Sequence, residues 1–203
     1  MEIDLYLKLM EEVKARMKAI RDIMTKKKTT SFEQTNIEFV CLQIRKILEL
    51  ITMGSLVANQ EQLESINADY TKFWNAKRTL SKIETLNSNF YPEPIIEKPS
   101  LEDGVVNDLI TIKENYLTRE LLENIYDLCC NVIHANNPFS DDIDYNQYAA
   151  KISEWYRLIM ALLNTHLVKF KDGEMYLIHM EGKDGHVHGY LFSRCEEKAF
   201  PKK

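Results

Sequence analysis

Apolar residues recur with a helical period along most of the chain. Over residues 3–24 the spacing is three or four residues throughout, which predicts an amphipathic helix. Over 32–58 apolar residues fall on every side, which is typical of a helix at the centre of a bundle. A third helix is predicted over 60–86, where Tyr70, Phe73, Trp74, Leu80 and Ile83 supply the apolar side.

Two more helices are predicted in the second half of the chain. Thr118 is a suitable N-cap for a helix from 119 to about 135, which Pro138 would stop. A fifth helix is expected from about 144 to 167. Between the third and fourth helices, the segment 87–104 holds three prolines and is expected to be a surface loop.

The spacing of apolar residues changes from helical to strand-like in the last forty residues. Asp-Gly pairs at 172–173 and 184–185 are turn signals, and strand-like segments flank both. The prediction is a small antiparallel β-hairpin or meander over 167–171, 174–181 and 186–194. The expected fold is therefore mainly α, with a five-helix bundle (1–166) and a C-terminal meander (167–203) packed together as a single domain.

Composition and charge narrow the class of protein. The chain has 26 Lys and Arg against 31 Asp and Glu, a net charge of −5, which argues against a protein that simply coats nucleic acid. Glu2 and Asp4 precede any apolar stretch, and the longest uncharged runs are far shorter than the roughly 20 residues of a membrane span. None of the four cysteines forms a CxxC pair. These features predict a cytoplasmic protein with reduced thiols and no membrane association.

The most distinctive motif is YDLCCNVIHANNPF, over residues 126–139. It places His134 in the last turns of a helix, followed by Asn136, Asn137 and Pro138. This resembles the helix-ending motif of HEPN-type domains, which are compact all-α bundles of prokaryotic RNases, toxins and defence proteins. The segment 37–59, with the FYPEP loop, also looks like uncharacterised bacterial proteins of this layout.

The resemblance implies a function in RNA metabolism, defence or a toxin–antitoxin pairing. His134 would be the catalytic residue of a metal-independent endoribonuclease that needs no cofactor, because imidazole exchanges protons near neutrality. The family carries an Arg shortly before this His, but residues 127–129 here are Asp, Leu and Cys. The chain is therefore expected to be a degenerate or divergent member, with Arg45 and Asn131 as further candidate catalytic residues. HEPN-type domains commonly form homodimers, and the same is expected here.

A second interpretation of His134 needs no catalysis. A histidine at a helix C-terminus can hydrogen-bond the last carbonyls and complement the negative end of the dipole. The corresponding function is a protein-binding or adaptor module that would hold a partner with the bundle groove and the meander. The sequence leaves both interpretations open.

Further candidate residues lie in the meander and on the first helix. If 182–185 form a hairpin loop, Glu181 faces His186 and His179 faces His188, so all four share one face and suit a zinc or other divalent metal site. The same residues can equally be solvated surface groups. A basic strip at 14–28 could contact RNA phosphates or be a solvated helix face. His166 is interpreted as a capping or packed histidine.

Overall fold

A computed structural model gives the fold of the chain. It describes residues 3–65, 76–102, 106–135, 138–139, 141–170 and 173–192. The helices in this part of the chain are α1 (Ile3–Met24), α2 (Glu33–Ala58), α3 (Gln60–Glu64), α4 (Ala76–Glu84), α5 (Arg119–Ile133) and α6 (Tyr145–Leu163). The strands are β1 (Glu93–Pro99), β2 (Asn107–Thr111), β3 (Thr165–Lys169), β4 (Met175–His179) and β5 (His188–Phe192).

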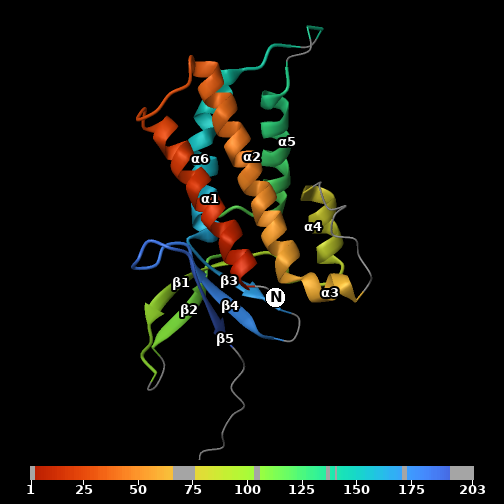
Figure 1. The fold of residues 1–203 in the computed structure, drawn as a ribbon, viewed down its shortest axis with the longest axis vertical. Coiled ribbons are helices and arrows are strands. Elements are labelled where there is room, and N and C mark those ends of the chain that lie inside the picture. Colours follow the sequence, from red (N-terminus) through yellow and green to blue (C-terminus); the bar gives the residue numbers. More distant parts are fainter. Residues whose placement is uncertain are drawn as a thin grey trace, which may run out of the picture.

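Helix α2 is the centre of the helical layer. It packs against α1, α4, α5 and α6, which surround it in Figure 1. Its apolar residues fall on several sides, and most of them are buried, among them Val40, Ile44, Ile47 and Leu48, whereas Leu42 is 36% exposed. The prediction of a central helix is confirmed, because a helix that is apolar all round can be stable only when neighbours cover every side.

The strands form one antiparallel sheet in the order β2-β1-β3-β4-β5. It lies across the end of the bundle where α1 begins and α6 ends (Figure 1). One face packs on the helices through Ile178 and His166, which are fully buried. The outer face has a small apolar cluster of its own, formed by Ile95, Leu167 and Leu177.

The expected fold class is wrong. The protein is a mixed α/β fold, because a five-stranded sheet replaces the small C-terminal hairpin. Strands β1 and β2 come from the middle of the chain, and β1 occupies the proline-containing segment that was expected to be a loop. Its prolines are tolerated because they lie at or next to the ends of the strand: Pro94 is its second residue and Pro99 its last.

The helix boundaries follow the predictions with two differences. Helix α6 ends at Leu163, and 165–169 form β3, where the prediction continued the helix to 167. The predicted helix over 60–86 is represented by α3 and α4, and its middle, 66–75, lies outside the described residues, as do the predicted strand residues 171, 193 and 194. Within the described chain, no helix is both long and apolar enough to span a bilayer.

Candidate functional site

The β4–β5 hairpin holds several of the residues singled out in the sequence. His179 lies directly opposite His188, so the predicted register is confirmed. The loop is closed by a hydrogen bond from the Gly182 N–H to the His186 carbonyl at 2.7 Å. Gly185 has a φ of +80°, which glycine adopts without strain. The ammonium of Lys14 on α1 donates to the Gly185 carbonyl and holds this loop against the helix.

Each histidine of the hairpin is hydrogen-bonded to a different carboxylate. His179 Nε2 lies 2.5 Å from Glu97 of β1, and His188 Nε2 lies 2.8 Å from Asp184 in the loop. The exposed ring of His186 lies 3.3 Å from a Glu11 oxygen. The His186 backbone N–H, together with the His188 ring, lowers the pKa of Asp184 to about 2.

This arrangement bears on the predicted metal site of His179, His186, His188 and Glu181. Glu181 is exposed, and the three imidazoles face separate carboxylate partners. Among the residues that the structure describes, no group of three or more His, Cys, Asp or Glu side chains could hold a metal ion. The metal site stays a prediction.

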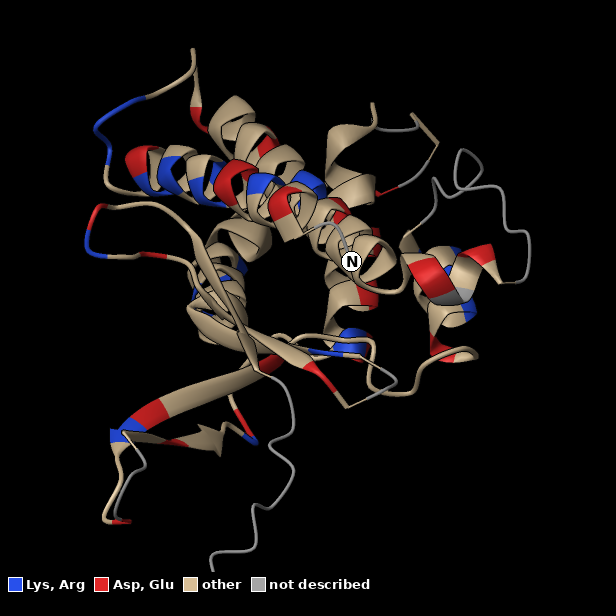
Figure 2. Cartoon of the chain, turned by 60° about the horizontal axis from the view of Figure 1, so that its bottom comes forward, with Lys and Arg blue, Asp and Glu red and all other residues tan. Residues whose placement is uncertain are grey.

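Strand β5 is one edge of the sheet and exposes three consecutive large apolar residues. Tyr190, Leu191 and Phe192 are 48%, 51% and 43% exposed. Tyr190 and Phe192 lie on the outer face, opposite Leu177 and Met175, whereas Leu191 lies on the other face. The strand has no Lys, Arg, Asp or Glu and is drawn entirely in tan in Figure 2.

Two features fix β5 in this position. Gly189 lies so close to α1 that an added Cβ would meet side-chain atoms of Ile3 at 3.1 Å and Leu7 at 3.3 Å. The ring of Tyr190 makes an edge contact with His179 at 5.4 Å and stacks on His188 at 6.4 Å. The start of the strand is therefore anchored on α1, while its last three residues remain open to solvent.

The other edge of the sheet, β2, has a different chemistry. Its sequence NDLIT contains one apolar residue on the exposed side, Ile110 (42% exposed), next to the charged Asp108. Asn107 donates to the Glu97 carboxylate of β1 at 3.0 Å. Polar and charged groups on an edge strand discourage pairing with another chain. Strand β5 has one polar ring, His188, at its start and no Lys, Arg, Asp or Glu.

The predicted catalytic residues do not come together. His134 is exposed and follows the last turn of α5, with an extended backbone (φ −90°, ψ 148°). Asn131 is also exposed, on the same helix. Neither side chain makes a hydrogen bond to another described residue, and Asn136 and Asn137, which follow His134 in the motif, lie outside the described residues.

Arg45 belongs to a different cluster. Its Nε lies 3.2 Å from Glu49, its Nη2 lies 3.4 Å from the Tyr126 hydroxyl, and its guanidinium lies over the Tyr126 ring at 5.3 Å. Tyr126 in turn donates to Glu49 at 3.2 Å. Tyr126 precedes His134 by eight residues on α5, which is about 12 Å along a helix axis. Arg45 thus joins α2 to α5 at a place away from His134.

No family model, no curated protein and no solved structure matches this chain. The resemblance to HEPN-type domains stays a prediction, and function has to be argued from the geometry. The apolar edge of β5 was not predicted as a site. The signal in the sequence was the uncharged apolar run Tyr-Leu-Phe at 190–192, inside the last predicted strand.

Proposed function

We propose that the protein is a protein-interaction module that pairs with a second copy of itself through strand β5. The observation that carries this proposal is the exposure of three consecutive large apolar side chains, 190–192, on an uncharged edge strand. An edge strand presents unpaired N–H and C=O groups to which an extended segment can add by main-chain hydrogen bonds. Natural proteins rarely leave such an edge apolar unless it is covered in use.

The sequence of β5 supports a second copy as the occupant. An antiparallel pair centred on Tyr190 would set Tyr190 against its own equivalent, Phe192 against His188, and Leu191 against Gly189. Opposed residues share a face, so the aromatic pairs would lie on the outer face and the Leu–Gly pair on the other face. No charges of like sign would meet, and the two five-stranded sheets would become continuous.

This surface fits a closed twofold dimer. In a twofold interface each subunit contributes the same patch. A strand that is complementary to itself can therefore form the whole interface. Aromatic cross-strand pairs contribute roughly 0.2–1 kcal/mol each. The proposal follows the adaptor interpretation of the sequence in using the C-terminal strands. It shares only the homodimer with the HEPN resemblance, which implied a dimer through the helices that carry the motif. A catalytic role for His134 receives no support from its exposed and isolated position.

The mass of the protein in solution tests the proposal. Light scattering after gel filtration should give twice the monomer mass of 23.8 kDa at micromolar concentration, and Leu191→Lys should give the monomer mass. Leu191 is half exposed, so a lysine there is compatible with the fold. Hydrogen exchange should show that protection of the β5 amides rises with protein concentration.

Ile110→Lys is the matched control. It places the same charge on the opposite edge strand, at a residue of similar exposure, and the dimer should persist. A wild-type protein that remains monomeric at high micromolar concentration would overturn the proposal. A dimer that survives Leu191→Lys but not Ile110→Lys would place the interface at β2 instead.

A further inference from the structure

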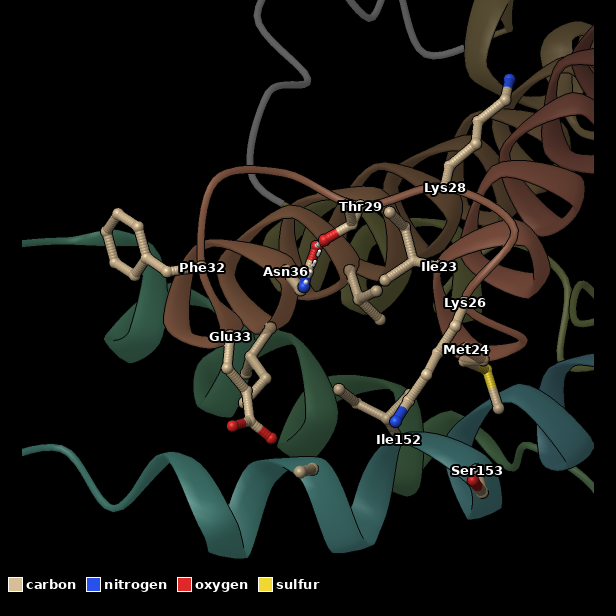
Figure 3. A pocket seen from close by; sticks show the side chains of 13 residues that line it. Ile23, Met24, Lys26, Lys28, Thr29, Phe32, Glu33, Asn36, Ile152 and Ser153 are labelled. Carbon is tan, nitrogen blue, oxygen red and sulfur yellow. Dashed lines mark hydrogen bonds between the residues drawn. The ribbon is translucent and has the colours of Figure 1, made fainter.

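A pocket of about 660 Å³ lies between the end of α1, the start of α2 and the first half of α6. Figure 3 shows it from close by, with the 25–32 turn along its upper rim. It lies on the helical layer, whereas β5 is part of the sheet at the other end of α1. Its volume is within the range of pockets that hold small molecules, about 300–1,000 Å³.

The floor of the pocket is apolar. Ile37 and Val40 of α2 and Ile152 of α6 line it, and each of these residues is less than one-tenth exposed. Ile23 from the last turn of α1 adds to the same wall. These side chains come from three helices that pack on one another, so the floor is part of the core. A ligand in contact with it must offer an apolar body.

Lys26 supplies the positive charge that reaches across the pocket. Figure 3 shows its side chain reaching across the pocket toward α6, while Lys28 points away. Asp22 lies 3.9 Å from Lys28, and Lys26 forms no ion pair within the described chain. An ammonium group above an apolar floor, with no carboxylate bound to it, complements a negative charge on a ligand.

The backbone of Lys26 is in the left-handed region, with a φ of 56°. Its N–H donates to the Ile23 carbonyl at 2.9 Å, so Lys26 ends α1 at the position where helices usually carry glycine. A residue with a Cβ is strained there, and strain of this kind is often retained at functional sites. The conformation directs a long cationic side chain over the pocket.

Glu33 limits the charge that the pocket can accept. It lies in the first turn of α2 and, like Lys26, points toward α6 (Figure 3). Because the Glu33 carboxylate lines the same pocket as the Lys26 ammonium, it opposes each additional negative charge on a ligand, so an anion with one charge is favoured over an anion with two. A phosphate monoester, which carries nearly two charges near neutrality, would be repelled more strongly than a carboxylate.

We propose that this pocket binds an amphipathic monocarboxylate. The apolar tail lies against Ile37, Val40 and Ile152, and the carboxylate accepts a charge-assisted hydrogen bond from the Lys26 ammonium. The polar side chains at the rim, Asn36 and Thr29, are hydrogen-bonded to each other at 3.1 Å and frame the entrance.

Titration with decanoate tests the proposal on the full chain. Calorimetry should show saturable binding at one site per chain, and the methyl resonances of Ile37 and Ile152 should shift. Decanol, which has the same tail without the charge, should bind about tenfold more weakly, as expected for the loss of one charge-assisted hydrogen bond. Decyl phosphate should also bind more weakly than decanoate.

Two variants at neighbouring positions complete the experiment. Lys26→Gln should weaken decanoate binding about tenfold and leave decanol binding unchanged. Lys27→Gln removes the same charge from a residue that does not line the pocket, and binding should be retained. Absence of saturable decanoate binding, equal binding by Lys26→Gln, or methyl shifts confined to residues outside the pocket would overturn the proposal.

Discussion

The hydroxyl of Tyr6 lies 2.9 Å from Nε2 of His166, and both side chains are buried. His166 Nδ1 lies 2.8 Å from the Leu163 carbonyl oxygen, which can only accept, so Nδ1 carries the ring proton. Nε2 is therefore the acceptor of the Tyr6 hydroxyl. This neutral imidazole joins the first helix to β3 and confirms that His166 is a packed histidine.

The burial of His166 predicts a loss of stability in weak acid. Burial lowers its pKa from 6.5 to about 4, so the unfolded chain binds a proton more readily than the folded protein. Stability contributed by the neutral ring is complete above pH 6.5 and is lost as the pH falls toward 4. The loss should reach roughly 3 kcal/mol, measured by urea unfolding across that range. The His166→Gln variant, which cannot titrate there, should show a shallower dependence, and an equal dependence in both proteins would contradict the assignment.

Removal of the Tyr6 hydroxyl should destabilise the protein at every pH. The Tyr6→Phe variant keeps the ring in the core but leaves His166 Nε2 buried without a donor, at a cost of about 1–3 kcal/mol. The pH dependence assigned to His166 should remain, because burial is the main cause of its lowered pKa. Urea unfolding of both proteins at pH 7 and pH 5 separates the two effects. A variant as stable as the wild type would mean that this hydrogen bond contributes nothing.

Replacement of Lys26 by glycine should stabilise the fold and weaken ligand binding in the pocket. Lys26→Gly relieves the left-handed strain at the end of α1, a gain of roughly 1 kcal/mol in thermal or urea unfolding. Decanoate binding should fall as in Lys26→Gln. Asn115, with a φ of 62°, is the matched control outside the pocket, and Asn115→Gly should gain less because asparagine tolerates this conformation. A Lys26→Gly protein less stable than the wild type would contradict the argument from strain.

His134 has no hydrogen-bond partner among the described residues, and we therefore predict that the protein does not cleave RNA through this residue. Arg45 is held by Glu49 and Tyr126, so it does not stand beside His134 to bind a phosphate. Labelled single-stranded and structured RNA, incubated with the protein at neutral pH in EDTA, should remain intact. His134→Ala should fold normally by circular dichroism and behave in the same way. Cleavage that disappears in the folded variant would establish the ribonuclease predicted from the sequence.

The helices were predictable because their signal is local. The three- and four-residue spacing over 3–24 and the N-cap at Thr118 each specify a helix without reference to distant residues, and the structure has α1 and α5 there. The β4–β5 register was predictable for the same reason, since a short Asp-Gly loop fixes which residues face each other.

The pairing of β1 with β3 joins segments that lie far apart along the chain. Glu93 pairs with Leu167, and neither segment carries a sequence signal that indicates the other as its partner. The apolar residues of β3 also fit the helical period of α6. A prediction based on periodicity alone therefore extended the helix into the start of β3. The contact between His179 and Glu97 could not be predicted either, because Glu97 belongs to the segment that was expected to be a loop. The pocket at Lys26 joins three helices and has no signal in any one of them.

The pairing of β1 with β3 has a consequence for synthesis on the ribosome. Residues 93–111 leave the ribosome before residues 165–192. The β1–β2 hairpin therefore lacks its partner strand β3 while most of α5 and α6 is still being synthesised. Until β3 and β4 arrive, Ile95 has no Leu167 or Leu177 to cover it. Completion of the sheet therefore comes late relative to the synthesis of β1 and β2, and nascent chains that stall before residue 165 expose an unpaired strand edge on which chaperones can act.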